Sequence, residues 1–197
     1  MAMYDDPRIL RAIAHPTRNR ILSELFARGG LRAADIARLI DIPANQASFH
    51  LRQLAKYGLV EEAPDEARDK RDRVWRLADP DGISFSTEDM VRQPGGEAAY
   101  EVFRRSAVAW GHHLVDRAYA RDRERRGRHS VAEWALRLDR DEAELVMREL
   151  GEVVERWRTK TREDDDDRET YSVFAVLQPY PTDETTTDEP TADEKEV

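Results

Sequence analysis

The stretch PANQASFHLRQLAKYGLV, residues 43–60, decides the fold of the first part of the chain. Within it Ala47, Leu51 and Leu54 recur at spacings of four and three residues, so they lie on one stripe of a predicted helix. Because an apolar stripe packs against a core, the residues between these positions are expected on the opposite, outer face. That outer face carries Asn45, Gln46, Ser48, Phe49, Arg52 and Gln53.

A second helix is predicted directly upstream, over residues 31–40. Its apolar positions follow the same helical period and are Ala33, Ile36, Ala37 and Ile40. Only Asp41, Ile42 and Pro43 separate the two helices, which leaves room for nothing but a sharp turn. Two short helices joined in this way form a helix-turn-helix.

Two further helices are predicted before this pair. The first spans residues 5–14 and has Pro7 in its first turn. The second runs from Pro16 to Ala27 and is ended by the glycine pair at residues 29 and 30. Their expected core-facing residues are Ile9, Leu10 and Ile13 in the first helix, and Ile21, Leu22, Leu25 and Phe26 in the second.

Strand-forming residues follow the helix-turn-helix. Gly58 is suited to the left-handed conformation that ends a helix, and residues 59–62 then begin a predicted strand. A charged loop over residues 64–72 separates it from a second β-prone run, VWRL at residues 74–77. A hairpin in this position is a wing. Its tip carries basic side chains suited to a phosphate backbone or a minor groove, namely Arg68, Lys70, Arg71 and Arg73.

With these elements in place, the first 80 residues resemble the ArsR-type winged-helix transcriptional regulators. The motifs that carry the resemblance are, in chain order, His15-Pro16-Thr17-Arg18 before a helix, Ser48-Phe49-His50-Leu51 in the recognition helix, LAKYGLV at residues 54–60, and Arg73-Val74-Trp75 in the wing strand. Two positions depart from the family pattern. Pro43-Ala44 stands where many members have Ser-Gln, and Asp41 replaces the usual glycine of the turn.

The resemblance implies a transcriptional repressor that binds an inverted-repeat operator in double-stranded DNA as a homodimer. Its two recognition helices would enter successive major grooves about 34 Å apart. Base contacts are expected from the outer face of the recognition helix, at Asn45, Gln46, Ser48 and Phe49. Contacts to phosphates or the minor groove are expected from Arg52, Arg68, Lys70, Arg71 and Arg73.

The charge of the chain bears on this interpretation. The net charge is -9, yet residues 1–80 hold 14 Lys and Arg against 12 Asp and Glu, a net charge of +2, and the remainder carries -11. A domain with so little positive charge must bind DNA through local clusters, and its affinity should fall steeply with salt. The same weak charge leaves open a second hypothesis, a winged-helix module that binds proteins and no DNA.

Residue counts and missing motifs exclude other classes of function. The chain has no cysteine, which excludes disulfides, thiolate metal sites and a cysteine nucleophile, and with them the soft-metal sensing that gives the resembling family its name. No apolar run approaches 18 residues and the first residues lack a signal-peptide pattern, so we expect a cytoplasmic protein without a membrane span. Because no catalytic motif appears, neither enzymatic activity nor a cofactor is expected.

The rest of the chain predicts a second, smaller domain. Residues 81–96 contain prolines and glycines without periodicity and are expected to be a linker. A long helix begins at Glu97, and its broad apolar face predicts a symmetric dimer. The residues expected to form that interface are Phe103, Ala107, Trp110 and Leu114.

Beyond the long helix, alternating apolar residues predict strands over residues 132–138 and 171–177. Between them, Asp139 with Glu142 forms the pattern of a capping box, which begins an amphipathic helix to about Lys160. The expected fold class is therefore α+β and mostly helical, with a winged helix-turn-helix over residues 1–80 and a helix-strand-helix-strand domain over residues 97–178. Residues 179–197 are expected to be a disordered acidic tail, which could compete with DNA for the wing.

Three further groups of residues were weighed as sites. His15 and His50 are each expected to have structural roles. His112, His113 and Asp116, with His129 later in the chain, are the grouping that looks like metal ligands. His112 and Asp116 share a helical face and are weak candidates for a metal site, but the grouping has no obvious fourth partner, so no metal is expected. An aromatic set could line a pocket for a small apolar effector or could simply form a core or dimer interface. This set is Trp110, Trp134, Trp157, Tyr171 and Phe174.

Overall fold

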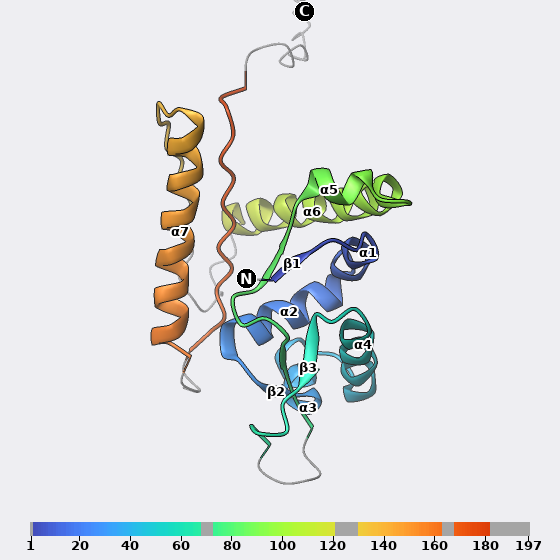
Figure 1. Cartoon of the computed structure of the whole chain (residues 1–197). Helices are drawn as coiled ribbons and strands as arrows, with labels where there is room; N and C mark the ends of the chain where they lie inside the picture. The colour runs from blue at the N-terminus through green and yellow to red at the C-terminus, as the bar shows by residue number, and fades with distance from the viewer. Residues whose placement is uncertain (1, 68–72, 121–129, 163–167, 182–197) are drawn as a thin grey trace, which may run out of the picture.

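The structure, a computed structural model, describes residues 2–67, 73–120, 130–162 and 168–181 (Figure 1). Its first part contains four helices and a small sheet. The helices are α1 (Arg8–Ile13), α2 (Pro16–Arg28), α3 (Ala33–Leu39) and α4 (Ala44–Lys56). The strands of the sheet are β2 (Leu31–Arg32), β3 (Val60–Glu62) and β4 (Val74–Leu77). The predicted helix-turn-helix and wing are thus confirmed.

Strand β4 lies in the middle of this antiparallel sheet, between β2 and β3. In the β3–β4 pair, Val60 lies opposite Leu77 and Glu62 lies opposite Trp75. The backbone amide of Ala63 donates to the carbonyl of Val74 at 2.8 Å, which extends the pairing towards the wing tip. The sequence did not predict β2, because two residues are too few to show a period of two.

The core of this part lies where α1, α2, α3 and α4 meet the sheet. The apolar stripes predicted from helical periodicity are confirmed, since most of their residues are buried and Phe26, Ala33 and Ile40 are partly buried against the same core. Each of these four helices and the segment that leads into β3 contribute fully or almost fully buried side chains. They include Leu10, Ile21, Leu25, Ile36, Leu51, Leu54 and Leu59. Burial of each such side chain stabilises the fold by roughly 1.5–3 kcal/mol, so the core is the main force that positions α4.

Residues 81–96 correct the expectation of an irregular linker. They contain strand β5 (Ile83–Phe85), which pairs in parallel with β1 (Ala2–Tyr4), and helix α5 (Thr87–Arg92). The hydroxyl of Ser86 caps α5 by accepting from the amide of Asp89 at 3.2 Å, and Met90 is fully buried. The strand depends on a partner about eighty residues away in the sequence, which no local pattern reveals.

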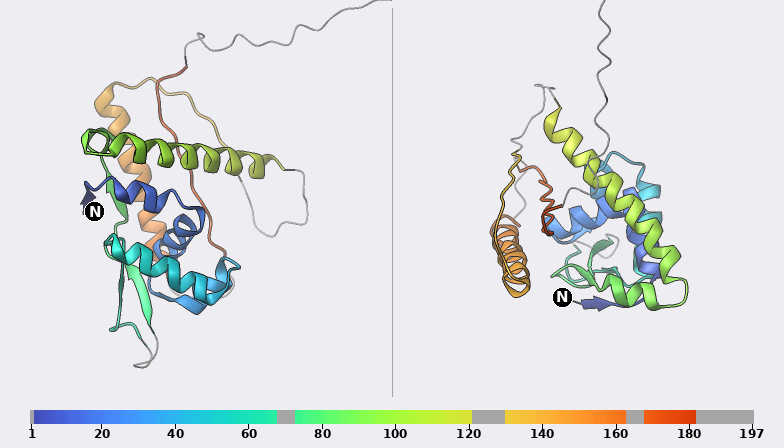
Figure 2. Two further views of the ribbon diagram at one scale, coloured as in Figure 1. Left: turned by 90° about the vertical axis from the view of Figure 1, so that its right-hand side faces the viewer. Right: turned by 90° about the horizontal axis from the view of Figure 1, so that it is seen from above.

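Helix α6 (Gly96–Tyr119) confirms the predicted long helix and crosses the body of the domain over α1 (Figure 2). The hydroxyl of Ser106 donates to the carbonyl of Ala14 at 2.7 Å, and the rings of Phe85 and Phe103 pack edge to face at 5.4 Å. The first half of α6 is therefore fixed to the winged helix. Its second half carries large apolar side chains that are exposed, namely Val108, Trp110, Val115 and Tyr119.

Helix α7 (Arg140–Lys160) also begins as predicted, with a capping box in which Asp139 accepts from the amide of Glu142 at 2.9 Å and Glu142 accepts from the amide of Asp139 at 2.8 Å. None of its residues is buried. Residues 168–181 run beside it as a coil (Figure 1). Within the four described ranges, no helix is both long and apolar enough to cross a membrane.

The strands expected over residues 132–138 and 171–177 are not formed, which corrects that part of the fold prediction. Alternating apolar residues describe a surface with two faces, but a strand also needs a neighbouring backbone to pair with. Neither segment is paired in a sheet, and their side chains face solvent, with Trp134 81% and Val173 73% exposed. The described part of the C-terminal half is thus helical, with two unpaired segments.

Candidate nucleic-acid interface

The turn between α3 and α4 fixes the position of α4. Asp41 adopts a φ of 53°, the left-handed conformation that a glycine would usually supply. The amide of Ile42 then donates to the carbonyl of Ala37 at 3.0 Å, which ends α3 in the manner of a Schellman motif. The turn thus accommodates the aspartate that stands in place of the usual glycine.

A cluster of charges supports α3 on its outer side. The carboxylate of Asp35 accepts from Arg32 at 2.7 Å and also from Arg38. The hydrogen bond to Arg32, together with that to Arg38 and the charge of both guanidinium groups, lowers the pKa of Asp35 to about 2. Asp35 therefore stays ionised at neutral pH and keeps both arginines at the surface beside the turn.

Helix α4 has the two faces that its sequence predicts. Ala47, Leu51 and Leu54 are completely buried. On the outer face Asn45, Gln46, Phe49 and Arg52 are exposed, whereas Ser48 and Gln53 are half-buried. Phe49 exposes half of its surface, although it is a large apolar ring on a folded domain. The face is therefore open along the length of the helix, as a recognition helix requires.

The described part of the wing carries acidic as well as basic side chains. Arg68, Lys70 and Arg71 lie outside the described residues. Arg73 has a largely exposed side chain, and its guanidinium lies 3.6 Å from the carboxylate of Glu62. The sequence interpretation missed Arg76, whose guanidinium binds Glu61 at 2.9 Å, Asp65 at 3.0 Å and Glu66 at 3.3 Å. These contacts raise the pKa of Arg76, so it is a structural cation that holds together an acidic wing base.

His15, directly before α2, is in contact with His50 of α4. Their ring centroids are 4.8 Å apart, and the Nδ1 atom of each is buried without a hydrogen-bond partner in the described part of the chain. Burial lowers the pKa of His15, and the nearby charge of Arg18 lowers it further. Burial also lowers the pKa of His50, with smaller contributions from the charges of His15 and Arg18. Arg18 itself donates to the carbonyls of Ala12 at 2.6 Å and Arg11 at 2.8 Å. The two imidazoles are therefore a neutral, packed pair.

The four residues expected at a dimer interface divide into two groups. Phe103 packs against the core of its own chain, and Ala107 and Leu114 are half-buried. Trp110 is 39% exposed and stacks on His113 with ring centroids 5.5 Å apart. The metal candidates His112 and Asp116 are both exposed. Among the described residues, no group of three or more metal-ligating side chains converges.

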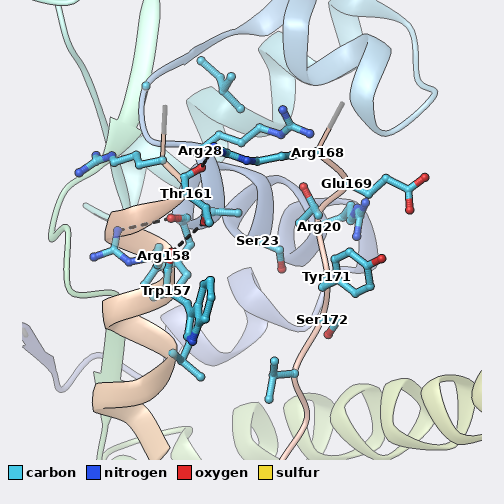
Figure 3. A pocket seen from close by; sticks show the side chains of 18 of the residues that line it. Arg20, Ser23, Arg28, Trp157, Arg158, Thr161, Arg168, Glu169, Tyr171 and Ser172 are labelled. Atoms are coloured by element: carbon cyan, nitrogen blue, oxygen red, sulfur yellow. Dashed lines mark hydrogen bonds between the residues drawn. The ribbon is translucent and has the colours of Figure 1, made fainter. Parts of the chain in front are cut away.

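The aromatic set expected to line an effector pocket is only partly brought together. Trp110, Trp157 and Tyr171 line a cleft of about 1050 Å³ between α2, α7 and residues 168–173 (Figure 3). Trp134 and Phe174 do not line it, and the ring of Phe174 lies instead against Gly111. The sequence interpretation also missed the arginines of this cleft, because they come from α2 and from residues 158–168, which are far apart in the chain. These arginines are Arg20, Arg28, Arg158, Arg162 and Arg168.

These features define the first part of the chain as a winged helix-turn-helix domain. Its sequence agrees with this, since residues 13–63 match a family described as a helix-turn-helix domain. The transcriptional repressor PagR of Bacillus anthracis is 33% identical over 51 residues, which are 26% of this chain and 52% of that protein. The chain thus spans about half the length of this curated relative.

Solved structures are also similar to the chain, at a low level. MarR from E. coli has a TM-score of 0.34 at 15% identity, over 75% of this chain and 87% of that one. ZitR from Lactococcus lactis has a TM-score of 0.30 at 16% identity, over 76% of this chain and 88% of that one.

Proposed function

We propose that this protein is a DNA-binding transcriptional regulator of the ArsR type that acts as a repressor. The observation that carries the proposal is the open outer face of α4, held rigidly by a buried stripe on its other side. Asn45, Gln46, Ser48 and Phe49 on this face supply amide, hydroxyl and apolar groups for base edges. The match of residues 13–63 to a helix-turn-helix domain and the similarity to a repressor support the same function.

Arginines beside this face would hold the DNA backbone. Arg52 is exposed on α4 itself, and Arg73 is exposed at the start of the second wing strand. With the basic residues of the wing tip, which are Arg68, Lys70 and Arg71, they would fix the register of α4 in the major groove. The acidic cluster around Arg76 places negative charge at the wing base, which would repel phosphates. The affinity for DNA would therefore depend on the few cations named above.

The regulator would act as a homodimer on an inverted repeat. Large apolar side chains are exposed on the second half of α6 and along α7, where Leu150, Val153, Val154 and Trp157 are each 38–53% exposed. Many exposed apolar side chains on two helices mark an interaction site, and a second copy presents an identical, self-complementary surface. Two copies related in this way would place two α4 helices on half-sites one helical turn apart.

Selection from a pool of random-sequence DNA duplexes tests the proposed function. The full chain should enrich two-fold symmetric sites whose half-sites are about 10 base pairs apart. The variant Asn45→Ala with Gln46→Ala should lose this enrichment while it keeps weak, salt-sensitive binding to any duplex, because the phosphate contacts remain. Absence of any enriched sequence with the unaltered chain would contradict the proposal.

A protein-binding module without DNA recognition is the second candidate. The observation that favours it is the wing base, where Glu61, Asp65 and Glu66 surround Arg76 and would face a phosphate backbone with like charge. The same selection separates the two candidates, since a module that binds only proteins retains no symmetric DNA site.

A further inference from the structure

Residues 131–138, which precede α7, have the alternating pattern of a strand. The apolar side chains of the pattern are all exposed, and they are Ala132, Trp134, Leu136 and Leu138. In the part of the chain that the structure describes, no backbone group of this segment takes part in a sheet or in a backbone hydrogen bond. The segment runs as an open length of chain to the start of α7 (Figure 2). Unpaired backbone in a strand-forming sequence is a template for pairing with another chain.

The second strand-forming segment of the same chain, residues 171–177, lies against α2 and α6. At its start the hydroxyl of Thr170 donates to the carboxylate of Glu24 at 2.8 Å. Further along, a ring carbon of Phe174 lies 3.2 Å from the place that a Cβ atom would take at Gly111. The fold thus uses this segment to cover two helices, which leaves the backbone of residues 131–138 available to a partner from outside the chain.

The two charges of residues 131–138 favour a second copy of the chain as that partner. In a strand, Glu133 and Arg137 lie on the face opposite the apolar side chains, two residues on either side of Ala135. When two copies pair antiparallel about Ala135, Glu133 of each copy lies opposite Arg137 of the other. A parallel pairing in register would instead place like charges side by side. Because opposite charges in cross-strand positions stabilise a sheet and like charges destabilise it, the charges favour the antiparallel arrangement.

The apolar face fits the same register. Trp134 of each copy then lies opposite Leu136 of the other, and Ala132 lies opposite Leu138. An aromatic ring opposite an aliphatic side chain is a favourable cross-strand pair. All four apolar side chains of the segment therefore meet an apolar partner.

Neighbouring registers lose the charge pairs. A shift of the two strands by two residues in one direction places Arg137 opposite Val131, and the same shift in the other direction places Glu133 opposite Asp139. The first leaves the arginine without a carboxylate, and the second brings two carboxylates together. The sequence thus specifies the pairing that is centred on Ala135.

Helix α7 supplies a second layer for the apolar face of such a ribbon. Two paired strands alone are marginally stable in water, and they need a further strand or a helix packed on them. Helix α7 begins directly after the segment, at Arg140, and none of its residues is buried. Its first half exposes Met147 and Leu150, which are three residues apart and so lie on one side of the helix. Pairing of two copies therefore provides two apolar helices to cover one apolar ribbon.

We propose that residues 131–138 of two copies pair as an antiparallel β-ribbon centred on Ala135, in which Glu133 of each copy binds Arg137 of the other. This inference rests on the homodimer of the proposed function and adds the contact that joins its C-terminal halves. The pairing is measured without DNA. A chain that lacks the ribbon can still select a DNA sequence, and a chain that selects no DNA sequence can still form the ribbon, so the two failures are distinguishable.

Cysteine cross-linking of the full chain tests the register, because the chain contains no cysteine of its own. In Ala135→Cys the two thiols lie opposite each other, where Cα atoms of paired strands are about 4.5–5.5 Å apart, within the range of a disulfide. Ala132→Cys is the matched control, since its two thiols lie six positions apart along the ribbon, or roughly 20 Å. Oxidised glutathione should convert most of the Ala135→Cys protein to a covalent dimer while about a tenth or less of the Ala132→Cys protein is linked. Equal linkage of the two variants, or no linkage of Ala135→Cys, would overturn the proposal.

Charge reversal tests the same contact without a covalent bond. Glu133→Arg and Arg137→Glu each replace the two opposite-charge pairs of the ribbon by two like-charge pairs. Each variant alone should therefore associate with itself roughly tenfold more weakly than the unaltered chain. An equimolar mixture of the two variants should regain the lost affinity, because an arginine then faces a glutamate at both positions. Sedimentation equilibrium measures all three samples.

The matched control for charge reversal is a pair of the same spacing on α7. Arg140 and Glu144 form an ion pair within one chain at 3.5 Å, and both side chains are largely exposed. Arg140→Glu, Glu144→Arg and their mixture should all associate as the unaltered chain does. Full association of Glu133→Arg or Arg137→Glu alone, or a mixture of these two that associates no better than either, would show that the charges do not meet between copies and would refute the ribbon.

Discussion

The hydroxyl of Thr170 donates a hydrogen bond of 2.8 Å to the carboxylate of Glu24, across 146 residues of sequence. The side chain of Glu24 is only 1% exposed, although it is charged, and it also binds Arg20 at 2.7 Å and Arg28 at 3.2 Å. A buried carboxylate is tolerated when its oxygens are paired and hydrogen-bonded, as here. Glu24 therefore fastens the C-terminal coil to the winged helix.

Replacement of Thr170 by valine should release the coil without unfolding the winged helix. The change keeps the side-chain shape but removes one hydrogen bond to a charged acceptor, which is worth roughly 1.5 kcal/mol. We expect faster protease cleavage within residues 168–181 and an unchanged urea midpoint for the helical core. Thr159→Val is the control, because Thr159 is exposed and its hydroxyl donates to Glu155 on its own helix. Equal cleavage rates in both variants would contradict the role given to Thr170.

Glu24 also shows where sequence reasoning reaches its limit. The period of α2 correctly placed Ile21, Leu22 and Leu25 in the core, because helical periodicity is a local property. It gave no reason to bury Glu24, whose partners include a residue of the distant coil. The same distinction explains why the turn at Asp41 was predicted but the pairing of β1 with β5 was not.

The C-terminal half shows a second limit of the same kind. The capping box at Asp139 was predicted, because both of its hydrogen bonds lie within four residues. The strands over residues 132–138 and 171–177 were not formed, because a pattern of alternation does not supply a pairing partner. The arginine-lined cleft could not be predicted either, since three separate segments build it.

Substitutions at Asp41 should separate backbone strain from side-chain contacts. Asp41 has a φ of 53° and an exposed side chain. Asp41→Val should lower the free energy of unfolding by about 1–2 kcal/mol, because a β-branched residue resists this conformation, whereas Asp41→Gly should be neutral or slightly stabilising. Urea denaturation measures both. If the two variants were destabilised equally, the turn would depend on the carboxylate and not on the backbone.

The pair of His15 and His50 should make stability depend on pH. The pKa of each ring is lowered from 6.5 in the folded chain. Between pH 6.5 and the lowered values, the unfolded chain therefore binds more protons than the folded chain. The stability from the neutral pair is complete above pH 6.5 and is lost as the pH falls from 6.5 towards the folded values. Asp35, with a folded pKa of about 2 against an ordinary 3.8, contributes stability that is lost only at lower pH, between these two values.

The measurement is the free energy of unfolding by urea at several pH values between 5 and 7.5. The variant His15→Leu with His50→Leu should flatten the slope over this interval, whatever its overall stability. His112→Leu with His113→Leu is the control, because both of these side chains are exposed. A slope that survives in the first variant would show that other groups cause the pH dependence.

Two substitutions on α6 should distinguish the dimer surface from the chain's own core. Val115 is 53% exposed, so Val115→Asp should shift a dimer towards monomer and leave helix content unchanged. Phe103 packs on Phe85, so Phe103→Ala should instead lower the free energy of unfolding, by about 2 kcal/mol for a half-buried ring. Light scattering and urea denaturation measure the two effects. A Val115→Asp protein that stays dimeric would place the interface elsewhere, for example on the exposed apolar side chains of α7.

The contact between Arg73 and Glu62, at 3.6 Å, gives a test of the wing. If Arg73 neutralises one phosphate, Arg73→Ala should weaken binding to all DNA sequences and reduce the slope of log affinity against log salt by about 0.9. Glu62→Gln should act in the opposite direction, because it removes a negative charge from the wing and frees Arg73 for the backbone. Anisotropy titrations between 50 and 200 mM salt, about the range over which such contacts are lost, measure both.

Arg140→Ala should change neither the affinity nor the slope, since Arg140 lies on α7, away from the wing. An unchanged slope for Arg73→Ala would remove Arg73 from the DNA interface.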